Sequence, residues 1–181
     1  MAAKPDSKQT VINVLNKARA SELAAILQYM SQHYELADSD YGQFAQQLKL
    51  IAIDEMRHAE MLAERILILG GTPTSQPDMP AKKKMPVLEI MKHDAELEEV
   101  AVRDYNEAHQ VCRDSRDSLS AKLFEQLVTE EQIHLDHFQD IIGHIEELGS
   151  AYLATQVGGA AEGAPARGFV ASQGGAPNAQ A

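Results

Sequence analysis

Two copies of one short polar pattern stand out in the sequence, and each contains residue types that bind metal ions. The pattern is Glu-x-x-His, formed by Glu55 with His58 and again, 76 residues further along, by Glu131 with His134. Residues three apart in a helix share a face, so each copy places a carboxylate beside an imidazole. One more glutamate precedes each copy at the same offset, which completes a set of six candidate ligands: Glu22, Glu55, His58, Glu98, Glu131 and His134.

The six candidate ligands interrupt stripes of apolar residues that recur at helical spacing. Next to Glu55 and His58, for example, the inward stripe contains Leu48, Ile51 and Leu62. Four carboxylates in an apolar interior repel one another unless they are protonated or bind cations, and two divalent ions cancel four negative charges. The pattern therefore predicts a site for two metal ions. Mixed oxygen and nitrogen ligands favour iron or manganese, leave zinc open, and exclude an all-oxygen calcium site or a thiolate site.

The ordinary interpretation of a single Glu-x-x-His is a solvent-exposed pair on a helix. Two copies in register, each with a preceding inward glutamate, argue against that interpretation here. Tyr29 and Tyr105 are also 76 residues apart and follow Glu22 and Glu98 by about two helical turns. We expect both tyrosines to hydrogen-bond to ligands across the bundle.

Four long helices are needed to position these residues. Apolar periodicity predicts them over residues 8–37, 41–69, 86–113 and 116–148. Ser7 is expected to cap the first helix, while Gly70 and Gly149 are expected to end the second and the fourth. A short fifth helix is predicted over residues 150–157.

The connection between the second and third predicted helices is much longer than the other two. It covers residues 70–86, which contain four prolines and no periodicity. The second helix is roughly 43 Å long and the extended connection reaches about 53 Å, so it can return along the bundle. The second and third helices then run parallel. We predict an all-α, ferritin-like four-helix bundle with one long crossover connection and a short C-terminal fifth helix.

Length, composition and charge restrict the organisation and the partners of the chain. Its 181 residues fit one domain, placed at residues 1–157, followed by a Gly- and Ala-rich tail, 158–181, that need not pack. A net charge of -11 attracts cations and repels nucleic acid. The sequence shows neither a signal peptide nor the roughly 18 consecutive apolar residues of a membrane span, and the single Cys112 fits a reducing compartment. We expect a cytoplasmic protein with no nucleic-acid or membrane partner.

The residues around the candidate ligands resemble bacterioferritin, over residues 10–157. The resemblance is carried by Glu22 with Gln28-Tyr29, by Ile53-Asp54-Glu55-Met56-Arg57-His58-Ala59-Glu60, by Glu98, and by Glu130-Glu131-Gln132-Ile133-His134. It implies that Glu22 and Glu98 are terminal iron ligands, that Glu55 and Glu131 bridge two irons, and that His58 and His134 bind one iron each.

The same resemblance implies an activity and an assembly. The chain would be a ferroxidase that oxidises Fe(II) with dioxygen or hydrogen peroxide at a di-iron centre within the subunit. The Fe(III) mineral would be stored in a hollow homo-oligomer of 24 subunits built from dimers. An electron-donor protein would be a further partner for iron release.

A second cofactor is implied by the resemblance, namely a haem or related iron porphyrin held between two subunits by the methionine at position 56. Met56 is rotated about 100° from Glu55 and so points away from the core. Its outward neighbours at helical spacing are small, and we expect them to form a shallow apolar surface: Ala45, Ala52, Ala59 and Ala63. Leu50 stands where the family often has a histidine of an auxiliary iron position on the inner wall, although Asp54 remains.

Three alternatives to iron storage are weaker. A rubrerythrin-like di-iron peroxidase normally carries a four-cysteine site, which the single Cys112 cannot build. Di-iron oxygenases usually add chain around a substrate pocket. A metal-free helical interaction module would have to bury four glutamates without cations, which is energetically poor.

Overall fold

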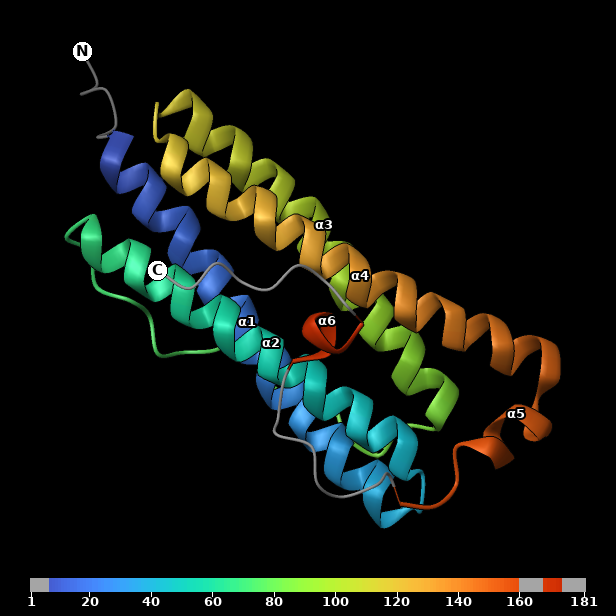
Figure 1. The fold of residues 1–181 in the computed structure, drawn as a ribbon. Helices are drawn as coiled ribbons and strands as arrows, with labels where there is room; N and C mark the ends of the chain where they lie inside the picture. Colours follow the sequence, from blue (N-terminus) through green and yellow to red (C-terminus); the bar gives the residue numbers. More distant parts are fainter. Residues whose placement is uncertain (1–6, 160–167, 174–181) are drawn as a thin grey trace.

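The computed structural model describes residues 7–159 and 168–173, and within these ranges it contains helices and no strand. Four helices are long and two are short (Figure 1): α1 Ser7–Asp38, α2 Gly42–Ile68, α3 Val87–Asp114, α4 Ser118–Leu148, α5 Ser150–Thr155 and α6 Phe169–Ser172. The helices of the described ranges include none that is long and apolar enough to cross a membrane. The predicted bounds of the four long helices agree with these within two residues.

The helix ends follow local chemistry. Asp117 caps α4 by accepting a hydrogen bond from the Ser120 backbone N–H at 3.0 Å, and Arg65 of α2 donates to both Asp117 carboxylate oxygens at 2.7 and 2.8 Å. After α2 the chain turns at Gly70, whose φ of 75° favours glycine. The prediction that Ser7 caps α1 is wrong, because α1 already begins at Ser7.

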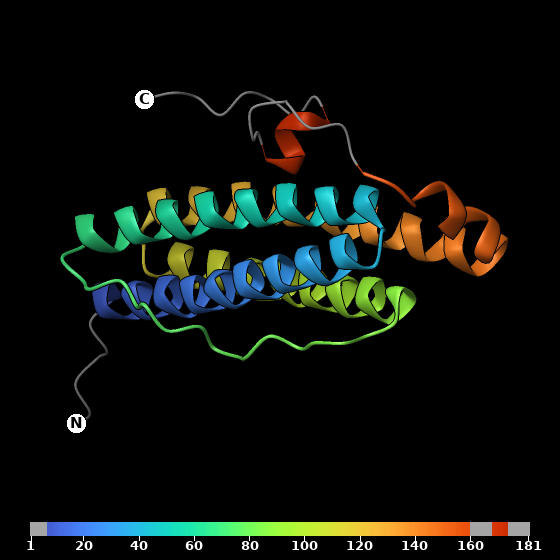
Figure 2. The same cartoon turned by 90° about the horizontal axis from the view of Figure 1, so that it is seen from below.

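The connection from α2 to α3 runs along the outside of the bundle beside α1, and α6 lies on the opposite side, against α2 (Figure 2). Side chains of α1 hold the connection in place: Gln28 exchanges two hydrogen bonds with the Lys82 backbone, at 2.9 and 2.7 Å, and Arg19 donates to the Thr74 carbonyl at 2.9 Å. Because the connection returns along the bundle, α2 and α3 run parallel, as predicted. The four-helix bundle with one long crossover is confirmed.

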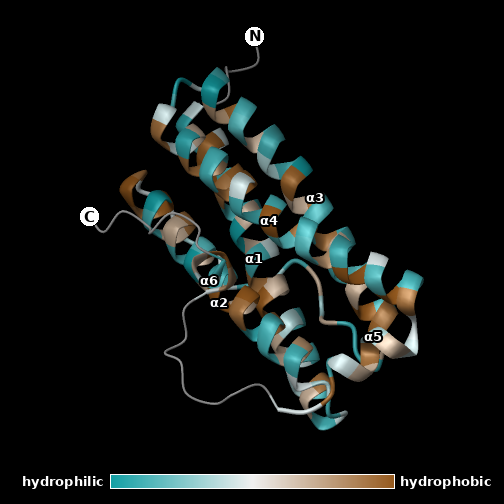
Figure 3. Ribbon diagram, turned by 45° about the vertical axis from the view of Figure 1, so that its right-hand side comes forward, coloured by the Kyte–Doolittle hydropathy of each residue, from teal (hydrophilic) through white to brown (hydrophobic). Residues whose placement is uncertain are grey.

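Two apolar clusters fill the interior, one on each side of a polar middle layer. Phe44 and Phe138 lie in one cluster, and Leu62 and Phe124 lie in the other; all four are fully buried. Hydrophobic and hydrophilic residues alternate along each long helix in Figure 3, as expected of amphipathic helices that surround a shared core. The two clusters hold the helices on both sides of the layer that contains the candidate ligands.

The C-terminal tail differs from its prediction. The short helix α5 is present at Ser150–Thr155, but the expectation that everything after residue 157 need not pack is wrong for α6. Phe169 of α6 is only 3% exposed and belongs to the apolar cluster around Phe44. Burial of a large apolar side chain stabilises the folded protein even when the flanking residues are small and polar. Residues 160–167 and 174–181 of the predicted tail lie outside the described residues, and the domain boundary at residue 157 stays a prediction.

Candidate metal centre

All six predicted ligands meet in the middle layer of the bundle, at most 2% exposed. Their ligand atoms form two overlapping groups, within each of which all atoms lie within 4.8 Å of one another. Glu55 and Glu131 belong to both groups. Glu22 and His58 complete the first group, called here the His58 position, and Glu98 and His134 complete the second, called the His134 position: each position has three carboxylates and one imidazole.

At the His58 position, the imidazole Nδ1 faces three carboxylates. It lies 2.9 Å from Glu55 Oε2, 3.0 Å from Glu131 Oε1 and 3.7 Å from Glu22 Oε1. On the other side of the ring, Nε2 lies 3.0 Å from the carboxylate of Glu130.

The His134 position repeats this arrangement. Nδ1 of His134 lies 3.2 Å from both Glu131 Oε2 and Glu55 Oε1, and 3.9 Å from Glu98 Oε1. Its Nε2 lies 3.4 Å from Asp54 Oδ2. Each histidine therefore directs Nδ1 at the centre and Nε2 at an outer carboxylate.

The two tyrosines bond across the bundle, as predicted. The Tyr29 hydroxyl of α1 donates to Glu98 of α3, and the Tyr105 hydroxyl of α3 donates to Glu22 of α1 at 2.5 Å. Burial raises the pKa of both phenols well above the ordinary value, and the neighbouring glutamates raise it further. Both tyrosines therefore stay protonated and serve as hydrogen-bond donors to Glu98 and Glu22.

The four glutamates of the centre fall into two pairs whose pKa values are shifted in opposite directions. Burial, then the charges of Glu131 and Glu55, hold the pKa of both Glu22 and Glu98 well above the ordinary glutamate value. Burial acts in the same direction on Glu55 and Glu131, but the imidazoles hold both pKa values below that value. In turn these carboxylates raise the pKa of His58 and His134 well above the ordinary value, against the effect of burial. The four carboxylates and two imidazoles of the centre are therefore electrostatically interdependent.

One oxygen of each carboxylate shared by the two groups lacks a hydrogen-bond partner. Glu55 Oε1 and Glu131 Oε1 are buried without a hydrogen bond, although a histidine Nδ1 lies 3.2 and 3.0 Å away, respectively. A single Nδ1–H cannot serve both carboxylates that face it. Two divalent cations would bind all these oxygens and the two Nδ1 lone pairs together, so the donor set fits a carboxylate-bridged two-metal centre.

The centre opens toward one side of the bundle. A cavity between α1 and α3, bordered by residues 78–80 of the long connection, reaches four of the candidate ligands: Glu22, Glu55, Glu98 and Glu131. Lys17 of α1 and Asp104 of α3 also line it, and they form an ion pair of 2.7 Å. This cavity provides a route to the centre for a small ion or oxidant.

The two outer carboxylates were not predicted as partners of the histidines. Asp54 and Glu130 each come directly before one of the two shared glutamates, and they are themselves 76 residues apart. Extending the repeat by one residue would have found both. Oriented carboxylates of this kind fix the ring and the tautomer of a metal-binding histidine.

The surface around Met56 differs from its prediction. Met56 is 44% exposed and points away from the centre, as expected, but Ala45, Ala52 and Ala59 are buried. Ala45 and Ala59 lie at the contact of α2 with α1, where His33 bonds to the Ala45 carbonyl at 2.7 Å and Arg19 donates to the Ala59 carbonyl. Ala63 is half-buried. The predicted surface formed by all four alanines is therefore wrong for the three that are buried. Leu50 is half-buried against the apolar cluster around Phe44 and offers no ligand atom.

A bundle of four helices around two metal positions that share two carboxylates defines the class of ferritin-like di-metal proteins. The family model for the ferritin-like domain matches residues 12–148. Bacterioferritin of Desulfovibrio desulfuricans is 48% identical over 166 residues, which cover 91% of this chain and 93% of the relative. Bacterioferritin of Streptomyces coelicolor is 36% identical over 81% of this chain and 89% of the relative. The chain belongs to the bacterioferritin family.

Solved structures agree with this membership. The X-ray structure of Desulfovibrio desulfuricans bacterioferritin, described for its diiron site in different catalytic states, matches with a TM-score of 0.86 and covers 91% of this chain and 97% of that chain. Mycobacterium tuberculosis bacterioferritin matches with a TM-score of 0.78 at 30% identity, over 87% of this chain and 97% of that chain. The resemblance seen in the sequence is confirmed.

Proposed function

We propose that this chain is an iron-storage ferroxidase, which oxidises Fe(II) to Fe(III) at a di-iron centre within the bundle and stores the product as ferric mineral. The observation that carries the proposal is the pair of overlapping ligand groups that share Glu55 and Glu131. Iron fits the mixed oxygen and nitrogen ligands. Each Fe(II) that is oxidised to Fe(III) gives one electron to the oxidant, dioxygen or hydrogen peroxide.

The protein's own residues have separate tasks in this reaction. Glu55 and Glu131 bridge the two positions, whereas Glu22 and Glu98 are terminal ligands that the two tyrosines hold in place. His58 and His134 bind through Nδ1 and keep their remaining proton on Nε2, where Glu130 and Asp54 accept it as a hydrogen bond. The apolar clusters on both sides exclude bulk water, which strengthens each of these interactions.

Aerobic addition of Fe(II) to the purified protein tests this function. We expect rapid growth of Fe(III) absorbance in the wild type. Loss of a residue that only hydrogen-bonds to a metal ligand lowers activity by about 10–100-fold. Glu55 is itself a ligand of both positions, so in Glu55→Ala the oxidation rate should fall by more than about 100-fold. Glu60→Ala, an exposed glutamate on the same helix, is the matched control. Equal rates in the wild type and in Glu55→Ala would overturn the assignment.

We also propose that Met56 binds haem together with a second copy of the chain. The support is its exposed thioether on the outer face of α2, together with the family membership. Met56→Leu keeps volume and apolarity but removes the sulfur, so the low-spin porphyrin spectrum should disappear while Fe(II) oxidation continues. Met79→Leu, at an equally exposed methionine, is the control. Retention of that spectrum in Met56→Leu would contradict this role.

Storage requires an enclosed cavity, and oligomeric assembly is the form that bacterioferritins take. We propose a closed shell of 24 subunits built from dimers, located in the cytoplasm, with an electron-donor protein as partner for iron release. Mass measurement of the assembly in solution tests the number of subunits. A stable monomer or an isolated dimer at micromolar concentration would remove the storage function.

A further inference from the structure

The short helix α6 lies directly on the outer edge of the His134 position. The Val170 backbone N–H donates to Asp54 Oδ2 at 2.9 Å, and the same oxygen lies 3.4 Å from His134 Nε2. The Phe169 ring lies 6.0 Å from the ring of His134 and 4.4 Å from the ring of His137, measured between centroids. Phe169 and Val170 are also the two large apolar residues of the tail 158–181.

The contact between α6 and α2 is close and depends on a glycine. A Cβ atom on Gly168 would lie 1.6 Å from Asp54 Oδ1. Gly168 itself has an extended backbone, with φ -61° and ψ 170°, that alanine adopts without strain. The atoms nearest to such a Cβ are those of the Asp54 carboxylate, so a side chain at position 168 collides with Asp54 first.

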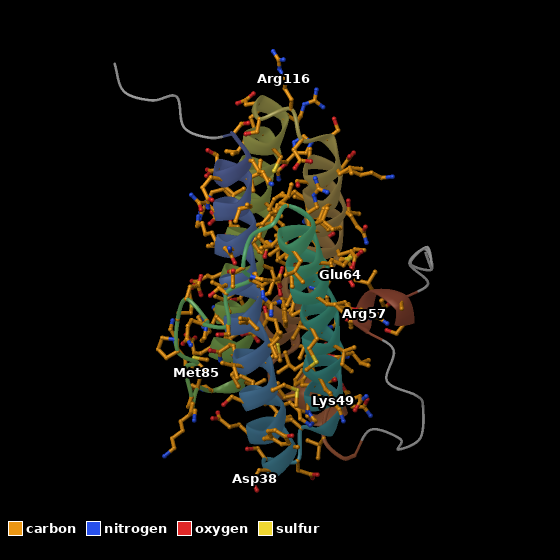
Figure 4. All side chains as sticks on the ribbon, turned by 90° about the vertical axis from the view of Figure 1, so that its left-hand side faces the viewer. Asp38, Lys49, Arg57, Glu64, Met85 and Arg116 are labelled. Carbon is orange, nitrogen blue, oxygen red and sulfur yellow. The ribbon has the colours of Figure 1, made fainter. Side chains whose placement is uncertain are left out.

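Asp54 is fixed from several directions by this arrangement. Arg57 donates to Asp54 Oδ1 at 3.2 Å, and the Val170 N–H and His134 Nε2 approach Oδ2, which leaves the side chain 1% exposed. Figure 4 labels Arg57 on the side of α2 where α6 lies. A carboxylate held in this way orients the imidazole and increases its basicity as a ligand.

We propose that the C-terminal segment 168–173 is a positioning element of the metal centre: it fixes Asp54 against His134 and closes the α2/α4 side of the centre, so that the two metal positions differ in affinity. This inference rests on the proposed function for its metal. The cavity that reaches the shared carboxylates lies between α1 and α3, on the other side of the bundle from α6. Metal exchange at the centre therefore takes place from the α1/α3 side while α6 is in place.

The substitution Gly168→Ala tests the proposal in the full-length chain. The added methyl group should displace segment 168–173 from Asp54 without removing any ligand. Hydrogen–deuterium exchange measures docking: protection of segment 168–173 and of the Asp54 region of α2 in the wild type should be lost in the variant. Co(II) titration, followed by calorimetry and by visible absorption, measures the positioning role. We expect two Co(II) ions per chain in both proteins, with about tenfold weaker binding of one ion in the variant.

Two further variants complete the test. Gly159→Ala lies in the same tail with open space around the added Cβ atom, so it should behave as the wild type. Asp54→Asn keeps the size of the side chain but removes its charge, and should weaken the same Co(II) ion as Gly168→Ala.

Rapid exchange of segment 168–173 in the wild type would overturn the proposal, and so would identical Co(II) isotherms for the wild type and Gly168→Ala. Neither result bears on iron oxidation. Failure of the proposed function would instead appear in the wild type itself, as an absence of Fe(II) oxidation.

Discussion

The His58 and His134 positions are alike inside the centre and different at its edge. Both share the carboxylates of Glu55 and Glu131, and each adds one imidazole and one further glutamate, which accepts a hydrogen bond from a tyrosine. At the edge, Glu130 behind His58 has a side chain that is 13% exposed, whereas Asp54 behind His134 is 1% exposed beneath α6. The inner similarity follows from the 76-residue repeat. The outer difference follows from the residue types, Asp54 against Glu130, and from one unrepeated segment, α6.

This comparison shows how a symmetric centre becomes asymmetric. Two equivalent positions would bind two cations with equal intrinsic affinity. An outer carboxylate shielded from water strengthens its histidine more than one that water can reach. The chain therefore differentiates the two positions without changing any of the six candidate ligands.

The largest effect is expected from a substitution that removes a ligand shared by both positions. Glu131→Ala should abolish binding of both Co(II) ions, because it removes a ligand from each position. Glu98→Ala should retain one ion, at the His58 position. Calorimetric titration of the two variants gives the stoichiometry directly. Loss of one ion in both variants would show that Glu131 does not bridge.

Smaller and unequal effects are expected from substitutions of the carboxylates behind the two histidines, Glu130 and Asp54. Glu130→Gln, which removes the charge behind His58, should weaken one Co(II) ion by no more than about tenfold, at the lower end of the range for outer partners. Asp54→Asn should cost more, because water replaces the exposed carboxylate of Glu130 more easily than the buried one of Asp54. Equal losses in the two variants would remove the difference between the edges.

The inner symmetry predicts a pair of equal and still smaller effects. Tyr29→Phe and Tyr105→Phe remove the hydrogen bonds to Glu98 and Glu22, respectively. Each bond is worth roughly 0.5–1.5 kcal/mol, so each variant should weaken Co(II) binding by about two- to tenfold. Tyr152→Phe, within α5 and outside the centre, is the matched control. An effect confined to one of the two central tyrosines would contradict the inner equivalence.

The smallest effect is expected on the stability of the helix bundle, from a substitution at Asp117 that leaves both metal positions unchanged. Burial acts to raise the pKa of Asp117, but the hydrogen bonds from Arg65 and Ser120 lower it below 3.8 in the folded protein. Because the pKa is lower in the folded state, ionised Asp117 stabilises the protein at pH values above 3.8, the ordinary pKa. This contribution is lost as the pH falls through the folded-state pKa. Asp117→Asn should therefore lower the melting temperature of the metal-free protein at pH 7.

The same variant provides its own control at low pH. Below the folded-state pKa of Asp117 the wild type and Asp117→Asn should melt at the same temperature, because both side chains are then neutral. Co(II) stoichiometry should be two in both proteins at pH 7. A melting difference that persists at low pH would assign the effect to packing instead of charge.

Most of the fold and the inner centre could be predicted from sequence because both depend on periodic patterns. Apolar spacing gave the four long helices to within two residues, and the long connection after Gly70 gave the crossover. The repeat placed the candidate ligands and paired Tyr29 with Tyr105. Their roles as terminal or bridging iron ligands, and the role of Met56 in haem binding, stay predictions.

Other features could not be predicted because they depend on contacts between elements. The alanines at positions 45, 52 and 59 have the same sequence pattern whether they face solvent or the protein interior, and only the packing of the helices decided that they are buried. Asp54 and Glu130 were visible as a repeated pair, but which histidine each one supports depends on how α2 lies beside α4.

The sequence by itself determined the helices, the crossover and the six residues of the centre, because helical periodicity and an internal repeat are properties of local spacing. Only the tertiary structure decided that the two metal positions differ. Val170 meets Asp54 across 116 residues of chain, and α6 comprises four residues. A helix of that length has no periodic signal, and its stability comes from the surface on which it packs.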